Sequence, residues 1–315
     1  MPPSVLLLTL TPNSDVDRER LARALPQLAG EDPALAIVSS AGPTVTIGAA
    51  GEQHLEIVVD RLRREFSVAA SVDTPRVAYR EAIRGTGDAE RKCARPIGGL
   101  GQDAHVRVRV SPAPAWSGCA FAEHLGPDRL PDRLVEAIRG AVHEAAATGI
   151  ATSHPLDACV ELCGGSYDVA DSSPDDFRQA ATDALRDAVR QAQSLIIEPV
   201  MRIEIQTTAE WMPIVLNAIT ARARRPRPIV ESGGPARTIR AHLPLARLIG
   251  VAAELRDRTG GRASTTMTLA TYWESNDDRD GDDGSSPVRE PLRPRPHPRI
   301  SAVAVPEPSD DLRDF

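Results

Sequence analysis

Alternating and periodic apolar positions divide the first 72 residues into short elements. Apolar runs at 5–11 and 67–72 predict strands, and turn residues 41–43 between two further runs, 35–39 and 44–47, predict a hairpin. Leucines at 21, 25 and 28, and apolar residues at 55, 59, 62 and 66, each form one helical stripe. The resulting order, strand, helix, strand, strand, helix, strand, predicts a ferredoxin-like split βαβ unit.

The same order of elements recurs near the end of the chain. Strand-like runs lie at 201–207, 228–231, 236–241 and 264–272, and two helical segments lie at 209–222 and 244–258, the second stopped by Gly260 and Gly261. We therefore expect a second ferredoxin-like unit.

The middle third has a different pattern. Thr74-Pro75 breaks the chain, and strand-like runs fill residues 76–124. A helical stripe at 130–148, a strand at 156–162, and a helix that Ser173 caps and Pro174 begins follow in turn. The prediction is α+β, with domains at 1–74, 75–195 and 196–274. Residues 275–315, rich in Asp, Gly, Ser and Pro, are expected to be a disordered tail.

A glycine-rich segment, IGGLGQDAH at 97–105, joins two strands of this middle third and is expected to be a loop. Glycine-rich loops that hold phosphate open onto a helix N-terminus, whereas a strand follows here, so a phosphate site is disfavoured. The only lysine, Lys92, precedes cysteine rather than Ser or Thr. This excludes a P-loop in the chain.

Composition narrows the function classes. A net charge of −7 and a pI near 5.6 argue against indiscriminate nucleic-acid binding, so any RNA contact must be local, and DNA is not an expected partner. The apolar run at 5–10 is too short to span a membrane and lacks the charged start of a signal peptide, so we expect a cytoplasmic protein with no membrane partner. The four cysteines do not form a zinc pattern and are expected to be buried, reduced thiols.

Five segments in order resemble the C-terminal half of bacterial elongation factor G, the ribosomal translocase. They are GEQHLEIVVDRLRREF with VAYREAIR (51–84), GGLGQDAH (98–105), GSYDVADSS (165–173), LIIEPVMRIEI (195–205) and RTGGRASTTM (258–267). The chain is also similar to the tetracycline-resistance ribosomal protection proteins, which share this architecture. The family's GTPase domain and adjoining β-barrel have no counterpart in this sequence.

The resemblance implies the family's domains III, IV and V: two ferredoxin-like domains flanking an α+β domain like domain 2 of ribosomal protein S5. In the family, domain IV is an arm whose two tip loops enter the decoding region of the small subunit. The corresponding RNA-contacting residues here are Gly98, Gly99, Gly101, Gln102, His105, Gly165, Ser166, Tyr167 and Asp168. A basic patch near the domain V position comprises Arg222, Arg224, Arg225, Arg227 and Arg262, and is either rRNA-facing or a solvated helix end.

Four residues at the expected tip depart from the family. Leu100 replaces an arginine, Asp103-Ala104 replaces Tyr-Gly, and Asp168 stands where histidine is usual. An acidic side chain facing RNA costs on the order of 1 kcal/mol or more. These changes argue against ordinary translocase action.

The sequence therefore predicts a non-enzymatic protein without cofactors. The leading hypothesis is a GTPase-less paralogue of elongation factor G that binds rRNA and ribosomal proteins at the factor site, as regulator, protection factor or decoy. Two alternatives stay open: one half of a split GTPase that works with a separate GTPase chain, and a degenerate remnant without present activity.

Overall fold

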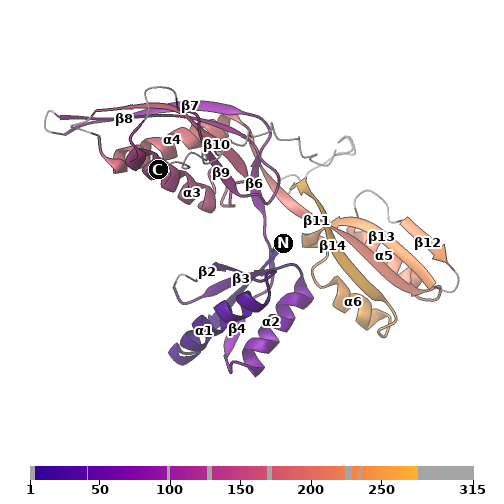
Figure 1. Cartoon of the computed structure of the whole chain (residues 1–315). Helices are drawn as coiled ribbons and strands as arrows, with labels where there is room; N and C mark the ends of the chain where they lie inside the picture. Colours follow the sequence, from indigo (N-terminus) through magenta and orange to yellow (C-terminus); the bar gives the residue numbers. More distant parts are fainter. Residues whose placement is uncertain are drawn as a thin grey trace, which may run out of the picture.

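The chain folds into three bodies, as Figure 1 shows for the computed structural model, which describes residues 4–40, 42–97, 100–125, 130–168, 172–223, 229–233 and 236–275. We call them the N-terminal body (residues 4–77), the arm (78–193) and the C-terminal body (194–275). The predicted disordered tail lies outside the described residues, apart from Ser275. Each body has its own sheet, and the fold is α+β, as predicted, with a ferredoxin-like body before and after the arm along the chain.

The N-terminal body has two helices on one face of a sheet ordered β2-β3-β1-β4, with β5 also paired to β1. Alternate residues of β1, Leu6, Leu8 and Leu10, are buried towards the helices, as the pattern predicts. Ser14 caps the first helix by accepting a hydrogen bond from the Asp17 backbone N–H. The elements are β1 (Leu6–Pro12), α1 (Asp15–Glu31), β2 (Ala36–Ser39), β3 (Val45–Ala49), α2 (Glu52–Arg64), β4 (Ala70–Val72) and β5 (Arg76–Val77).

The arm is a four-stranded sheet, ordered β7-β8-β10-β9, whose one face is covered by α3 and α4. Strands β9 and β10 are parallel, and α3 provides the crossover that a parallel pair requires. Valines at 106, 108 and 110 are buried against the helices, while the arginines between them face away. The elements are β7 (Gly87–Ile97), β8 (Leu100–Pro112), β9 (Cys119–Glu123), α3 (Asp132–Thr148), β10 (Ala158–Tyr167) and α4 (Pro174–Gln191).

The C-terminal body repeats the ferredoxin-like order, with a sheet ordered β12-β13-β11-β14. The predicted helix at 244–258 is wrong in its first half. Strand β13 continues to Pro244, a short 3-10 turn η1 (Leu245–Arg247) follows, and Gly250, with φ +77°, starts α6 (Val251–Arg258). The other elements are β11 (Ser194–Thr208), α5 (Met212–Arg222), β12 (Ile229–Gly233), β13 (Ala236–Pro244) and β14 (Ser264–Glu274).

Strand β11 belongs to two bodies at once. Its first four residues pair with β6 (Arg80–Ile83) at the base of the arm, and the remainder pairs with β13 and β14. The arm and the C-terminal body are therefore joined by a continuous hydrogen-bonded sheet rather than by a linker.

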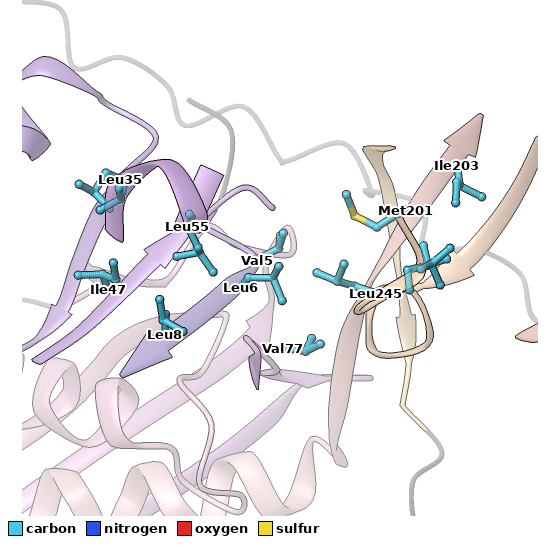
Figure 2. Close-up of a cluster of buried hydrophobic side chains, with 14 of the residues drawn as sticks. Val5, Leu6, Leu8, Leu35, Ile47, Leu55, Val77, Met201, Ile203 and Leu245 are labelled. Atoms are coloured by element: carbon cyan, nitrogen blue, oxygen red, sulfur yellow. The ribbon is translucent and has the colours of Figure 1, made fainter. Parts of the chain in front are cut away.

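A shared hydrophobic core joins the N-terminal and C-terminal bodies (Figure 2). Leu245 of η1 lies beside Leu6 and Val77, and all three are buried. At the edge of this contact the Glu52 carboxylate accepts the Gly250 N–H, at 2.9 and 3.0 Å from its two oxygens. A side chain of α2 thus holds the residue at which α6 of the other body begins.

Candidate nucleic-acid interface

The first predicted tip loop is shorter than the sequence suggested. Strands β7 and β8 pair as far as Ile97 with Leu100, so the expectation of a loop over 97–105 is wrong for its second half. Gly101 and Gln102 lie in β8, opposite Pro96 and Arg95. Gly98 and Gly99 lie outside the described residues. The predicted loop extends to residue 105, whereas the pairing of β8 with β7 starts at Leu100.

The second predicted loop, 165–172, also starts as a strand. Gly165, Ser166 and Tyr167 are the last residues of β10 and pair with β8. A Cβ atom on Gly165 would lie 2.5 Å from the His105 carbonyl oxygen, so glycine is needed here for close strand packing. Beyond the strand, Asp168 and Ser172 are linked by two hydrogen bonds, and residues 169–171 lie outside the described residues.

His105 and Ser166 are brought together by this pairing. Ser166 Oγ lies 3.3 Å from His105 Nδ1, and the Glu90 carboxylate lies 3.5 Å from His105 Nε2, too far for a good hydrogen bond. The buried Nε2 atom has no hydrogen-bond partner. Tyr167, the next residue of β10, directs its side chain to the opposite face and is 39% exposed, so its ring is accessible for stacking on a base.

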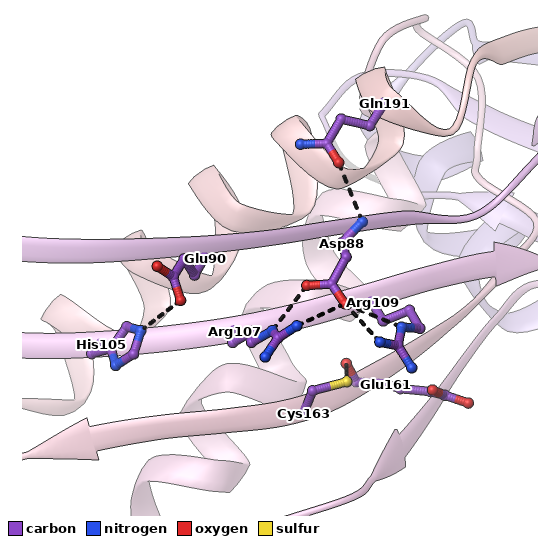
Figure 3. Close-up of polar contacts among 8 residues, drawn as sticks. All are labelled: Asp88, Glu90, His105, Arg107, Arg109, Glu161, Cys163 and Gln191. Atoms are coloured by element: carbon purple, nitrogen blue, oxygen red, sulfur yellow. Dashed lines mark hydrogen bonds and ion pairs between the residues drawn. The ribbon is translucent and has the colours of Figure 1, made fainter.

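The open face of the arm sheet carries charges that compensate one another (Figure 3). Asp88 of β7 accepts hydrogen bonds from both Arg107 and Arg109 of β8, with shortest distances of 2.9 and 2.8 Å. Arg107 first, and then Arg109, hold the pKa of the Asp88 carboxyl below its usual range. Because these arginines are already paired, the stem of the arm offers little free positive charge for RNA.

Two cysteines also lie on this open face. Cys159 and Cys163 are half-buried free thiols, so the prediction that they are buried in the core is wrong. Strand β10 directs Val160 and Leu162 to the helices, and the alternate residues Cys159, Glu161 and Cys163 to the open face. Partial burial raises the pKa of both thiols, so neither is an activated nucleophile.

The predicted basic patch is only partly described. The Arg222 guanidinium donates to the Glu254 carboxylate at 2.5 Å and to the Ala218 carbonyl oxygen, so its charge is compensated within the C-terminal body. Arg262 is exposed at the turn before β14. Arg224, Arg225 and Arg227 lie outside the described residues. The rRNA-facing role of this patch stays a prediction.

Sequence reasoning missed a buried polar cluster at the base of the arm. The Asp157 side chain is fully buried and accepts hydrogen bonds from Arg80 and from the backbone N–H groups of Trp116 and Gly118. Glu81, also fully buried, accepts from three successive backbone N–H groups at 150–152. Both acids lie within segments predicted as strands, at 76–124 and 156–162, and nothing in the sequence pattern shows that their side chains are buried.

Other kinds of site receive no support from the described residues. They contain no group of three or more His, Cys, Asp or Glu side chains able to hold a metal ion. None of their helices is long and apolar enough to cross a membrane.

Comparison with known proteins identifies the three bodies. Family models match in succession: "Elongation Factor G, domain III" at residues 1–74, "Elongation factor G, domain IV" at 75–193, and "Elongation factor G C-terminus" at 195–281. The crystal structure of ttk003000868 from Thermus thermophilus is similar, with 28% sequence identity and a TM-score of 0.62. The similarity covers 88% of this chain but only 42% of that protein. Residues 1–281 thus consist of elongation factor G domains III, IV and C-terminal domain, and the chain is a translation-factor-like protein.

Proposed function

We propose that this protein binds the ribosome at the translation-factor site through rRNA, with residues 1–74, 75–195 and 196–274 as its three domains. The observation that carries the proposal is the succession of three elongation factor G domain models on one chain. A ribosome-binding role also implies a cytoplasmic location.

We assign the contacts to the two ends of the molecule rather than to the stem of the arm. Arg107 and Arg109 share the single Asp88 carboxylate, and the nearby Glu90 and Glu161 offset the remaining positive charge of the stem. The tip offers an exposed Tyr167 and a short Gly98-Gly99 connection, and the C-terminal body offers Arg262 and the arginines at 224–227. Few cationic contacts predict modest affinity and a shallow dependence on salt.

We propose that these 315 residues occupy the translation-factor site of the ribosome without hydrolysing a nucleotide. Phosphate-binding loops of the P-loop type need a lysine followed by Ser or Thr, and Lys92 lies in β7 and precedes a cysteine. The protein would then act as regulator, protection factor or decoy.

Co-sedimentation with 70S ribosomes and with each subunit, over a range of salt concentrations, tests the proposal. Changing Arg224 and Arg225 to Ala should weaken binding and make its salt dependence shallower, by about one unit of slope for each phosphate that is no longer neutralised. The double variant Arg18→Ala, Arg23→Ala is the matched control, since these exposed arginines of α1 form only local pairs with Asp15 and Glu19. Absence of binding to ribosomes and to both subunits would refute the proposal.

A second candidate is a component of a two-part GTPase, with the motor provided by a separate chain. It is motivated by elongation factor G domain models on a sequence whose only lysine is not followed by Ser or Thr. A GTPase that co-purifies with the chain, and whose ribosome-dependent hydrolysis rises on adding it, would support this candidate. Adding tetracycline to the same binding assay tests the protection role, because a protection factor should release the bound drug.

A further inference from the structure

The loop between β8 and β9 holds a tryptophan in a strained backbone conformation. Trp116 has φ +67°, a region that residues other than glycine rarely adopt. Such a conformation persists only where surrounding contacts impose it, and it marks positions with a specific role. Here the Trp116 N–H donates to the buried Asp157 carboxylate at 2.7 Å, and the Gly118 N–H donates to the other oxygen at 2.8 Å.

The indole held by this loop lies between the arm and the C-terminal body. It stacks on Tyr272 of β14, with ring centroids 5.5 Å apart and an angle of 17° between planes. The Arg80 guanidinium lies over the same indole, 5.2 Å from its centroid, and is itself fixed by Asp157. Trp116 therefore links the buried polar cluster at the base of the arm, through Asp157 and Arg80, to strand β14 of the C-terminal body.

This stack restricts a motion that the backbone connection leaves free. Strands β6 and β11 pair over only four residues, and two-stranded ribbons vary widely in twist. A ladder of this length fixes where the arm joins the C-terminal body but permits rotation about the ribbon. The ring pair of Trp116 and Tyr272, together with the ion pair of Arg84 with Glu274, adds contacts to β14, a strand of the C-terminal body with which β6 does not pair.

We propose that Trp116 is a positioning residue that fixes the direction of the arm relative to the C-terminal body. The effect of this positioning on affinity rests on the function proposed above. The arm tip and the C-terminal body each make a modest RNA contact, and a fixed separation lets both contacts form together. Rigid linkage of two contacts raises affinity because the second binding step becomes intramolecular.

Energy transfer between two dyes measures the arm direction in the free protein. Clickable noncanonical residues at Ala147 of α3 and Ala253 of α6, both exposed, place one dye on each body and leave the native cysteines untouched. Trp116→Gly removes the ring and relieves the backbone strain, so the variant should fold with an unchanged melting temperature but a broader distance distribution. Trp116→Phe keeps an aromatic ring and should restore the narrow distribution.

Trp273→Ala is the matched control, because it removes an indole from the neighbouring position of β14 that takes no part in the stack. It should leave the distribution narrow. A distribution as narrow in Trp116→Gly as in the unaltered protein would overturn the inference.

Ribosome co-sedimentation separates this inference from the proposed function. We expect Trp116→Gly to bind at least about fivefold more weakly, and Trp116→Phe to bind normally. A broadened Trp116→Gly that binds as tightly as the unaltered protein would overturn the importance of arm direction for binding. If the distribution broadens and the unaltered protein does not bind ribosomes, the positioning role stands and the proposed function falls.

Discussion

Glu81 is the position where replacing one oxygen atom by an amide nitrogen should lower the stability of the protein most. Its carboxylate is fully buried and accepts from the N–H groups of Ile150, Ala151 and Thr152, and from the hydroxyls of Thr152 and Ser194. In Glu81→Gln the amide nitrogen is best placed near Ser194, whose hydroxyl can turn to accept. The Ala151 N–H then faces another donor at its nearer contact and keeps only a 3.3 Å contact with the remaining oxygen, beyond the usual hydrogen-bond range.

The magnitude follows from these bonds. One unsatisfied buried N–H costs about 1–3 kcal/mol, and the remaining bonds lose charge assistance worth roughly 1 kcal/mol each. Relief from burying a charge offsets part of this loss, which leaves a destabilisation of about 3 kcal/mol. Since 1.4 kcal/mol is about tenfold in an equilibrium constant, the amides at 150–152 should exchange hydrogen roughly 100-fold faster.

Hydrogen exchange followed by mass spectrometry, together with urea unfolding, provides the measurement. Glu144→Gln is the control: this carboxylate is 70% exposed and pairs with Arg178 on the arm surface, so its loss should change stability by less than about 0.5 kcal/mol. If Glu81→Gln is as stable as Glu144→Gln and the loop amides remain protected, the hydrogen-bonding account of Glu81 is wrong.

Three further changes test other parts of the structure. Gly165→Ala places a Cβ atom 2.5 Å from the His105 carbonyl oxygen and should destabilise the arm by about 1–3 kcal/mol in urea unfolding. Ser173→Ala removes the cap of α4 and should cost about 1 kcal/mol, seen as faster exchange in the first turn. Burial raises the pKa of Glu52 above its ordinary 4.5 despite the Gly250 N–H, so its ionised form is disfavoured in the folded state. The stability that the protonated Glu52 carboxyl contributes is complete below pH 4.5 and is lost as the pH rises through the pKa of the folded state. The stability of Glu52→Gln relative to the unaltered protein should therefore increase between about pH 4 and 7, as measured by urea unfolding.

Helices and strands with a regular spacing of apolar residues were predictable from the sequence. The leucine stripe of α1 and the cap at Ser14 locate that helix, because burial and capping act within a few residues. The break at Gly250 was missed, because Pro244 to Arg258 is periodic throughout and only the contact with Glu52 of another body shows where α6 begins.

The candidate site was predictable only in part. Glycines at 98–101 and 165 suggested loops, but cross-strand pairing extends β7, β8 and β10 into both segments. The pairing of β10 with β8 joins residues about 60 positions apart, which local pattern does not show, whereas β7 and β8 pair as a hairpin within the glycine-rich segment itself. The buried acids Glu81 and Asp157 were missed for the same reason, since their donors come from distant loops.

The pairing of β6 with β11 makes the arm an insertion whose two ends meet. Ile83 and Ser194 are opposite each other in the ladder, so the chain leaves the sheet and returns to it at one place after 110 intervening residues. A segment with adjacent ends can change in length or sequence without moving the strands that flank it. The arm could therefore be exchanged for that of a relative, or replaced by a short turn, while the two remaining bodies keep their shared core.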